Sequence, residues 1–279
     1  MAEEFFKRGN EYTQKASFYY EMGKKQDAED EIKKALEEYN KAHEIDPSNP
    51  EYYRKVGELF LKTGKYQDAI EQFNKAIEMR PGATVYYIEK GTALNSLNKY
   101  EEALKELDKA ISLNPKNSQA YLQKSISLKN LGNFNDALSA INLAIQYLPK
   151  YTGMEGFLAY DYEIKASILM ALGNFNDALS ILDEADRISP VNKKSYNTRR
   201  IMRANLLNLT GKYQEALDEF TSLLKIDSNN AFFHYGKAIA LENLGKYELA
   251  KIEIENAVQL NPTNELFKAA KERINSKSL

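Results

Sequence analysis

The fold is decided by residues 50–81, which read PEYYRKVGELFLKTGKYQDAIEQFNKAIEMRP. Small and apolar residues recur in this stretch at the spacing of an α-helix, once before Gly64 and once after it. Glycine readily takes the left-handed conformation that ends a helix, whereas proline cannot continue one and disfavours helical geometry in the residue before it. The stretch therefore predicts two helices that are joined at Gly64 and stopped by Pro81.

The same helical hairpin recurs along the chain. Prolines 34 residues apart mark the ends of successive hairpins, and they are Pro47, Pro81, Pro115 and Pro149. Glycines stand between the two helices of most hairpins, and they are Gly23, Gly64, Gly132, Gly173, Gly211 and Gly245. A fixed period of this kind is typical of repeat arrays, in which each unit has an apolar face that only the next unit covers. We therefore expect an all-α fold of stacked hairpins.

The composition excludes several classes of protein. The chain has 279 residues, a formal net charge of −2, two histidines and no cysteine, so it has no disulfides, thiolate nucleophiles or cysteine-based zinc sites. Its first residues include acids where a secretory signal has cations, and no apolar run is long enough to span a bilayer. We expect a cytoplasmic protein that holds no metal and no cofactor.

Small residues mark the middle of each first helix, where two helices can approach closely. They are Ala16, Gly57, Gly91, Ser125, Ala166, Ala204 and Ala238. A second series marks the start of each second helix, and it comprises Ala28, Ala69, Ala103, Ala137, Ala178, Ala216 and Ala250. With these features the chain resembles the tetratricopeptide repeat (TPR) family over nearly its whole length. The resemblance implies a single α-solenoid, a right-handed superhelix of TPR hairpins. Its repeats are expected at residues 9–47, 50–81, 84–115, 118–149, 159–190, 197–228 and 231–262, and a capping helix at 263–279.

The first repeat departs from the period. Gly23 and Pro47 lie seven residues further apart than Gly64 and Pro81, and the apolar stripe stays in phase between them. We predict one long helix over residues 25–45 that projects from the stack. Phe5 and Phe6 are expected just before the first helix, at an end without a capping helix. This favours an alternative function, a self-assembling or complex-assembly subunit that uses the long helix.

Two further insertions leave alternatives open. Residues 150–158, with Tyr151 and Phe157, form either a ledge for a ligand or partner or a hairpin junction that packs on itself. Residues 193–203, with Arg187 upstream, are the densest basic stretch. They bind an acidic peptide, a phosphate or an RNA backbone, or they form a solvated helix entry with local acidic partners. We favour the structural interpretation for both insertions.

The family's first helices line a concave groove that holds peptides or helices. Carried over to this chain, that geometry implies a groove formed by Arg54, Ile88, Asn95, Leu122, Ile126, Asn130, Tyr160, Ile201, Asn208, Tyr235 and Asn243. The apolar members of this row indicate a surface for a protein partner. Because asparagine both donates and accepts, the four asparagines either hold an extended backbone or merely loosen the last helical turn.

A row of cations precedes the small crossing residues, and it comprises Lys15, Lys90, Lys124, Lys165, Arg203 and Lys237. The row either tracks an anionic polymer or, as we favour, covers apolar surface while its charged heads lie beside acids of the second helices. The carboxylate clamp by which some family members hold chaperone tails is absent, because Val85 and Glu89 stand where that clamp has a cation.

No recognisable motif supports catalysis. The sequence has no Gly-rich phosphate loop, no HExxH and no nucleophile elbow, and His234 occupies a position that tyrosine fills in other repeats. We therefore expect no enzyme and no catalytic residue. The function that we expect is a non-catalytic protein–protein interaction scaffold that binds a peptide or protein segment in the groove. An anion- or RNA-binding solenoid is a weaker alternative, and neither nucleic acid nor a membrane is an expected partner.

Overall fold

The computed structural model describes residues 1–189 and 193–277, without the side chains of residues 193–197. Pro190 and the side chains of Lys193 and Lys194, which the sequence analysis singled out, lie outside the described residues. Fifteen helices occur in the described part. They are α1 (Ala2–Glu21), α2 (Lys25–Ile45), α3 (Glu51–Lys62), α4 (Tyr66–Met79), α5 (Thr84–Ser96), α6 (Tyr100–Leu113), α7 (Ser118–Asn130), α8 (Phe134–Tyr147), α9 (Glu155–Ala171), α10 (Phe175–Ile188), α11 (Lys193–Leu209), α12 (Tyr213–Leu224), α13 (Ala231–Asn243), α14 (Tyr247–Leu260) and α15 (Glu265–Ser276).

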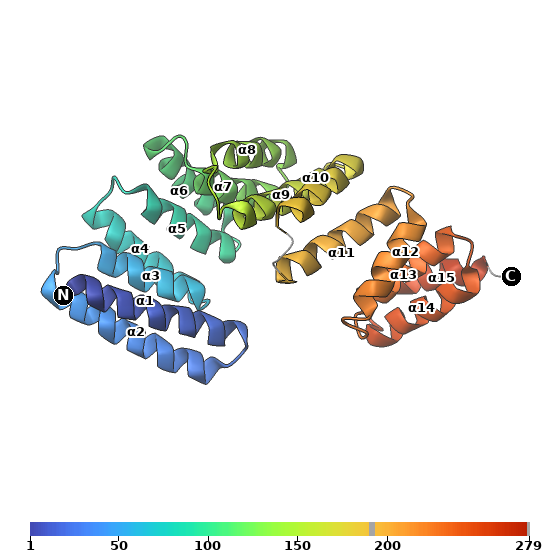
Figure 1. Cartoon of the computed structure of the whole chain (residues 1–279), viewed down its shortest axis with the longest axis horizontal. Coiled ribbons are helices and arrows are strands. Elements are labelled where there is room, and N and C mark those ends of the chain that lie inside the picture. Colours follow the sequence, from blue (N-terminus) through green and yellow to red (C-terminus); the bar gives the residue numbers. More distant parts are fainter. Residues whose placement is uncertain (190–192, 278–279) are drawn as a thin grey trace. The chain divides into compact units, whose positions relative to one another are not determined.

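The helices form two compact units, each of which is described by itself (Figure 1). The first unit, Met1–Leu148, holds α1–α8, and the second, Pro149–Leu279, holds α9–α15. Within each unit, successive helices pair as hairpins, and the first helix of a hairpin packs on the second helix before it. The predicted all-α helical-repeat fold is confirmed, and the described residues contain no strand. A single superhelix over all repeats stays a prediction.

The helix ends follow the signals in the sequence. The six expected glycines have φ between 71° and 80°, the left-handed region that glycine tolerates. In the third hairpin Asn98 takes this place with φ 59°, and asparagine is among the few other residues that adopt it. Asn117, Asn230 and Asn264 stand immediately before α7, α13 and α15 and cap these helices. Each side chain accepts a hydrogen bond from one or two backbone N–H groups of the first turn.

Small residues lie where the helices of a hairpin cross. A Cβ atom on Gly57 would lie 2.6 Å from Cε1 of Phe73, and one on Gly91 would lie 2.8 Å from Cγ of Leu107. Ala69 and Ala103 are fully buried in the cores of the hairpins. The interior is close-packed, so these positions have no room for larger side chains.

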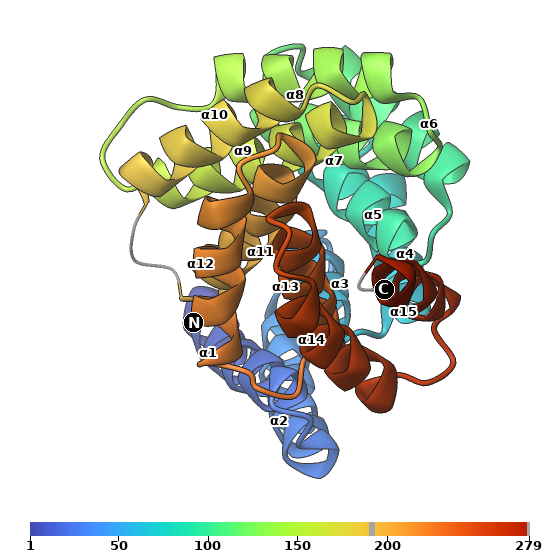
Figure 2. The same ribbon diagram turned by 90° about the vertical axis from the view of Figure 1, so that its right-hand side faces the viewer.

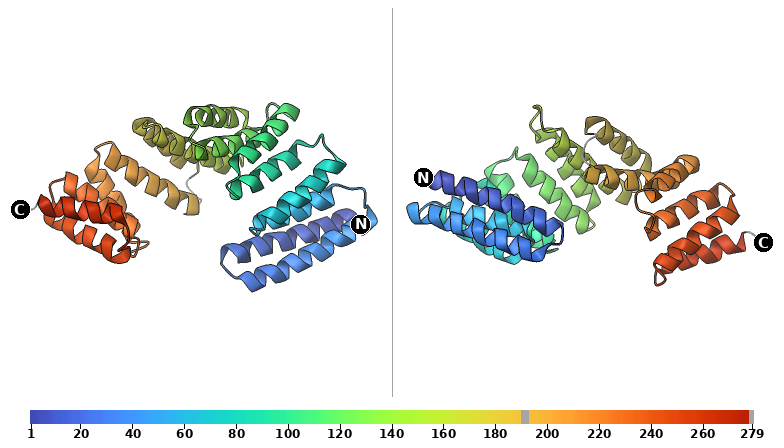
Figure 3. Two further views of the ribbon diagram at one scale, coloured as in Figure 1. Left: turned by 180° about the vertical axis from the view of Figure 1, so that it is seen from behind. Right: turned by 60° about the horizontal axis from the view of Figure 1, so that its bottom comes forward.

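The N-terminal hairpin is longer than the others in both helices. The predicted long helix is confirmed as α2, but the expectation that Phe5 and Phe6 precede the first helix is wrong, since α1 begins at Ala2. The added turns of α2 lie along α1 rather than alone (Figure 3). Tyr39 is fully buried, and a Cβ atom on Gly9 would lie 2.3 Å from its Cε1 atom. The two helices lengthen together because neither can bury its added apolar residues alone.

The 150–158 insertion is a turn followed by added helix. Helix α8 ends at Tyr147 and α9 begins at Glu155. Between them Gly153 has φ 100°, and its N–H donates to Oε2 of Glu155 at 2.7 Å. The side chains of Tyr151 and Phe157 are 66% and 59% exposed. These two rings therefore do not pack on the insertion itself, contrary to the interpretation that we favoured.

Candidate functional site

The candidate site is the surface that the first helix of each hairpin presents. We call α1, α3, α5, α7, α9, α11, α13 and α15 the first helices, and their open surface the first-helix face of each unit. Consecutive first helices contact one another, as α3 contacts α5 and α11 contacts α13. Among the described residues no comparable contact joins consecutive second helices. The first helices therefore lie on the inner side of each unit.

Helix α13 shows how each first helix is placed. On one edge Gly236 accepts a hydrogen bond from Asn208 of α11, and on the other edge Tyr235 stacks on Phe267 of α15, with ring centroids 5.1 Å apart. One stripe of the helix runs along the edge that Tyr235 marks. Its residues lie at spacings of three, four and four, and they are Phe232, Tyr235, Ile239 and Asn243. Figure 2 shows α13 among α11, α14 and α15. The equivalent residues form the corresponding stripe of each first helix, and neighbouring helices cover some of them.

The structure changes the predicted apolar row. Ile88 and Leu122 are only 6% and 7% exposed, so they pack between helices and do not line an open surface. Ile126, Ile201 and Tyr235 are half-buried, and Tyr160 is 43% exposed. The expectation of a continuous apolar row open to water is therefore wrong for the middle of the first unit. Exposed apolar side chains stand near the start of α5, α9, α13 and α15, and near the end of α1 and α11.

The four asparagines occupy two different positions. Nδ2 of Asn95 donates to the backbone oxygen of Gln123 at 3.1 Å, and Nδ2 of Asn208 donates to that of Gly236 at 2.9 Å. These two amides tie one first helix to the next. Asn130 and Asn243 stand one residue later in their repeats and donate to carbonyls of their own helices at 2.8 Å. A backbone-holding role for the four asparagines stays a prediction.

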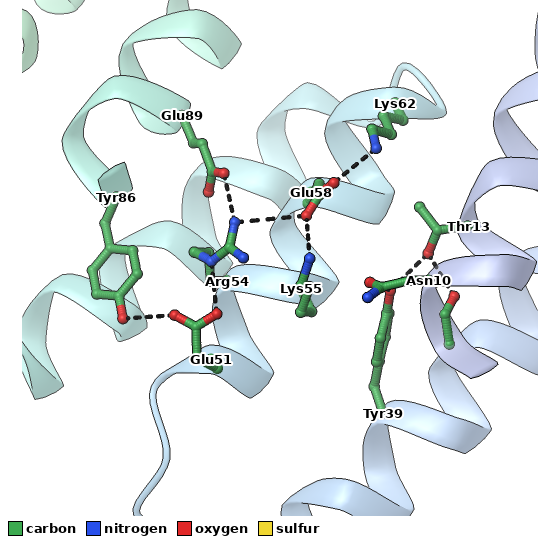
Figure 4. Close-up of polar contacts among 11 residues, drawn as sticks. Asn10, Thr13, Tyr39, Glu51, Arg54, Lys55, Glu58, Lys62, Tyr86 and Glu89 are labelled. Carbon is green, nitrogen blue, oxygen red and sulfur yellow. Dashed lines mark hydrogen bonds and ion pairs between the residues drawn. The ribbon is translucent and has the colours of Figure 1, made fainter. Parts of the chain in front are cut away.

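Arg54 lies at the centre of an ionic network between α3 and α5 (Figure 4). Its Nε donates to Oε2 of Glu51 at 2.9 Å, and its Nη1 donates to Oε1 of Glu89 at 2.8 Å. Nη1 also lies 3.6 Å from Oε2 of Glu58, and Oε1 of the same carboxylate accepts a bond from Lys62 at 2.7 Å. The guanidinium that the sequence assigned to a ligand is therefore engaged by three carboxylates of the chain.

The network sets the pKa values of two glutamates in opposite directions. Burial alone would raise the pKa of Glu58, but hydrogen bonds from Lys62 and Lys55 outweigh it and lower that pKa to about 2. Burial raises the pKa of Glu89 to about 7, against the attraction of Arg54, and the Glu58 carboxylate adds to the increase. Oε2 of Glu89 is buried and has no hydrogen-bond partner among the described residues. The carboxyl group of Glu89 is thus only partly hydrogen-bonded in this network.

Two features of the first unit escaped the sequence analysis. The first is Glu89, which lies one repeat and one further residue beyond Arg54, a separation that signals a contact between neighbouring first helices. The second is a buried bond between Tyr39 and Thr13, with 2.8 Å between their hydroxyl oxygens; Tyr39 also donates to Oδ1 of Asn10 at 3.0 Å. Burial raises the pKa of Tyr39 to about 12, so it stays a hydrogen-bonding phenol. No periodic signal marks this bond, because it is confined to the longer hairpin.

The basic stretch at 193–203 pairs with nearby acids where its side chains are described. The pairs, with that of Arg187, are Arg187–Glu184, Arg199–Glu163, Arg199–Asp186, Arg200–Glu219 and Arg203–Asp183. The side chain of Arg199 is 1% exposed and also donates to the backbone oxygens of Ala185 and Ser189. The local acidic partners are confirmed for these arginines, but the entry is not solvated throughout, because Arg199 is buried.

Members of the cation row also pair with acids of the chain. Four members pair with carboxylates of second helices, and the pairs are Lys90–Glu106, Lys124–Asp108, Arg203–Asp183 and Lys237–Glu253. Lys15 lies over the ring of Tyr12, with Nζ 5.3 Å from the centroid. The structural interpretation of this row is confirmed for these members.

Both histidines are packed against neighbours. Nδ1 of His234 lies 2.6 Å from Oε2 of Glu253, and its Nε2 lies 3.1 Å from the backbone oxygen of Ser228. His43 stacks on Tyr52 with 4.3 Å between ring centroids. Over the described residues, no group of three or more His, Asp or Glu side chains could hold a metal ion. No helix in the same part of the chain is long and apolar enough to cross a bilayer.

The outer surface of the N-terminal hairpin carries aromatic rings under cations. Arg8 and Lys41 lie over Phe5, at 4.7 and 5.9 Å from its centroid, and Lys24 lies over Tyr19 at 5.9 Å. Such contacts cover the rings with charged groups that keep their water. Phe18 and Tyr20, in the last turn of α1, remain 58% and 44% exposed. Association of copies through this hairpin stays a prediction.

Family models match three parts of the chain. Models described as tetratricopeptide repeat match residues 11–82 and 233–264, and one described as TPR repeat matches residues 91–132. Over 77 residues the chain is 32% identical to the probable UDP-N-acetylglucosamine–peptide N-acetylglucosaminyltransferase SPINDLY of Arabidopsis thaliana. That match covers 28% of this chain and 8% of that protein, so the chain spans a small fraction of its relative.

Solved structures share the fold. The TPR protein YrrB is 22% identical with a TM-score of 0.60, and the match covers 73% of this chain and 99% of YrrB. The pilF protein of Pseudomonas aeruginosa is 14% identical with a TM-score of 0.67, over 83% of this chain and 98% of that one. At these identities the likeness shows the helical-repeat fold alone.

Proposed function

Because the chain belongs to the tetratricopeptide repeat family, we propose that it is a non-catalytic scaffold that binds a segment of a partner protein on its first-helix faces. The TPR fold is in general a protein-interaction scaffold, and the segment and the faces are the specific part of the proposal. YrrB, which shares the fold, is described as having an unusual peptide-binding site. We extend peptide or protein binding to this chain, in the cytoplasm, as part of the same proposal.

One observation carries the proposal. Each first helix leaves part of a stripe at spacings of three, four and four residues uncovered, as Gln119 and Asn130 are exposed on α7 and Asn205 and Phe232 on α11 and α13. Other conspicuous groups of the chain are satisfied internally, since the described arginines of the basic stretch have acidic partners. The first-helix faces are therefore the surfaces that we propose for a partner.

The structure narrows the residues that we propose for binding. Ile88 and Leu122 support the faces from beneath, because they are buried. Arg54, Asn95 and Asn208 hold neighbouring first helices together. The side chains that we propose to touch a ligand are Ile126, Asn130, Tyr160, Ile201, Tyr235 and Asn243, with Phe232 added.

Site-specific photo-crosslinking tests the proposal. We would place a photoreactive phenylalanine at Gln119 or Asn205 on the first-helix faces, and at Glu71 or Ile252 on second helices as matched controls, since all four residues are exposed. The proposal expects the same partner band in an extract of the source cells from positions 119 and 205, and none from positions 71 and 252. Crosslinks from the second-helix positions alone, or from none of the four, would refute it.

The alternative function, assembly through the N-terminal hairpin, has a separate test. The lengthened α1–α2 pair is the one feature that favours it, because it adds surface beyond the regular repeat. We expect a monomeric mass by light scattering at high protein concentration, since cations cover the outer rings of Phe5, Tyr12 and Tyr19. A dimeric mass that Phe5→Glu abolishes would favour assembly instead.

A further inference from the structure

We propose that the first-helix face of the second unit binds an apolar segment of a partner protein that carries no cationic side chain, anchored on Phe232 and Leu266. This inference rests on the proposed function and adds the chemistry of the segment and the unit that holds it. It concerns the second unit alone, Pro149–Leu279. Three observations carry it: the exposure of apolar side chains, the state of the charged groups and the contrast with the other unit.

Large apolar side chains are exposed at one repeated position of the second unit. Phe232 and Leu266 each stand two residues after a capping asparagine, Asn230 or Asn264, and they are 59% and 55% exposed. Tyr160 holds the same position on α9 and is 43% exposed. The same position of the first unit carries Asn10, Glu51, Val85 and Gln119, and only the valine is apolar. Thr198 completes this position in the second unit and Val85 is 40% exposed in the first, so what is particular to the second unit is the exposed aromatic rings and leucine.

The apolar surface continues along α13. Phe232 makes an edge contact with Phe267, with ring centroids 5.2 Å apart, and Tyr235 stacks on the same buried ring. Tyr235 and Ile239 are half-buried and pack against the core of the last hairpin. The surface therefore consists of the aromatic rings of Phe232 and Tyr235 and the branched side chain of Ile239, packed against the core. Contiguous exposed apolar surface of this kind marks sites for protein partners.

Two carboxylates of this face, Glu163 and Glu242, are already paired. Oε1 of Glu163 accepts from the buried Arg199 at 2.8 Å. Glu242, whose side chain is 3% exposed, accepts two bonds from Arg273, at 2.9 and 2.8 Å, and one from Lys277 at 2.9 Å. Arg273 and Lys277 are about half-exposed and share the single carboxylate of Glu242. This group of three residues, the rim of the face, therefore keeps a net positive charge.

A cationic partner segment therefore has nothing to gain from these groups. A lysine or arginine would lose water without meeting a free carboxylate, and it would face the positive rim. The first unit differs, because its stripe on α3 consists of Glu51, Arg54, Glu58 and Lys62. The charges thus disfavour a cationic segment and the exposed apolar side chains favour an apolar one, so we assign an apolar segment without cationic side chains to the second unit.

A display library of short random peptides tests this inference on the full chain. Peptides retained by the wild-type chain are sequenced, and the binding of individual synthetic copies is measured by fluorescence anisotropy. We expect Leu, Ile, Val and Phe to be enriched and Lys and Arg to be depleted. Phe232→Glu and Leu266→Glu are each expected to weaken binding about tenfold or more, because they put a charge on the anchoring surface.

Ile252→Glu is the matched control, since Ile252 lies on α14 in the same unit and is 58% exposed. We expect this variant to bind like the wild type. Circular dichroism melts check that all variants fold, and Leu266→Glu keeps the test valid if Phe232→Glu loses stability with its contact to Phe267.

The outcomes separate the inference from the proposed function. Retained peptides that are rich in Lys or Arg would overturn the inference, as would binding that Ile252→Glu weakens as much as Phe232→Glu does. Binding that is lost only on Ser96→Arg, on the exposed end of α5, would move the site to the first unit and leave the scaffold function standing. If no peptide is retained while positions 119 and 205 crosslink a partner, the inference alone fails; if neither occurs, both fail.

Discussion

The hydroxyl of Ser127 donates to Oδ1 of Asn95 at 2.6 Å, across the contact between α7 and α5. The amide of Asn95 thereby has both its donor and its acceptor engaged, since its Nδ2 bonds Gln123. Asn208 occupies the same position in the second unit and donates to Gly236, but its Oδ1 is buried with no partner among the described residues. This acceptor lacks a donor because Ala240 holds the position that Ser127 has in the other unit, and alanine has no hydroxyl.

Ala240→Ser is expected to stabilise the chain. A serine hydroxyl at this position reaches the unpaired acceptor of Asn208 in the way that Ser127 reaches Asn95, and Ala240 is fully buried. A hydrogen bond to a buried acceptor contributes about 0.5–1.5 kcal/mol, so we expect a rise of that size in the free energy of unfolding by urea. The same substitution in an Asn208→Ala background should give no gain. An equal gain in both backgrounds would show that the amide is not involved.

Glu89→Gln is expected to stabilise the chain above neutral pH and to have little effect in acid. The folded-state pKa of Glu89 is raised to about 7, so the folded chain holds this proton more tightly than the unfolded chain does. The contribution of Glu89 to stability is therefore present below the unfolded pKa and is lost as the pH rises through about 7. We expect the variant to exceed the wild type by about 1–3 kcal/mol near pH 8, and by nothing near pH 4.

Unfolding curves at a series of pH values check this expectation, with Glu78→Gln as the control because Glu78 is exposed on α4. The difference between the Glu89 variant and the wild type should grow between the two pKa values, while that of the control stays flat. A constant difference for Glu89→Gln at all pH values would contradict the raised pKa.

Ala103→Leu is expected to destabilise the first unit. Ala103 is fully buried on α6 where the two helices of the third hairpin cross, so the added methylenes force the helices apart. Overpacking of this kind costs about 1–3 kcal/mol. The measure is the urea midpoint, and the comparison is Ser139→Leu on the exposed side of α8. Equal midpoints for the two variants would mean that the crossing is not close-packed.

Arg199→Met is expected to be the most damaging of these substitutions. It removes a buried guanidinium and leaves Glu163, whose side chain is 9% exposed, without its partner. Removal of one member of a buried pair costs about 3–5 kcal/mol, largely through the charge that remains. Adding Glu163→Gln should recover part of that loss, because it removes the stranded charge. A double variant less stable than Arg199→Met would show that the pair is not the cause.

The sequence predicted most of the architecture because its signals are local. Glycine and proline act on their own backbone, and the small residues at each crossing recur with the period, so the hairpins and the helix α2 followed from residue types alone. The start of α1 was missed, since nothing in residues 1–8 marks a helix until Phe6 and Gly9 are seen to pack on Tyr39. Turn signals set where a helix stops more sharply than where one begins.

The candidate site was predicted less well, for a geometric reason. A helical stripe identifies one side of a helix, but Ile88 and Leu122 sit at the edge of that side, and only the approach of the next first helix buries them. Likewise, Asn95 and Asn130 look alike in sequence, yet a shift of one residue turns one amide to the neighbouring helix and the other to its own backbone. Rotation about the helix by one residue is about 100°, which decides between the two.

By itself the sequence determined the repeat: its period, the helix in each half and the small residues at each crossing, because these depend on contacts within one hairpin. Only the tertiary structure decided which side chains remain for a partner, because contacts between hairpins, about one period apart in the chain, use up some of them. Arg54 binds Glu89, Asn208 binds Gly236 and Glu242 binds Arg273, and each of these pairs lies 28 to 35 residues apart. Phe232 and Leu266 stay exposed after these contacts form.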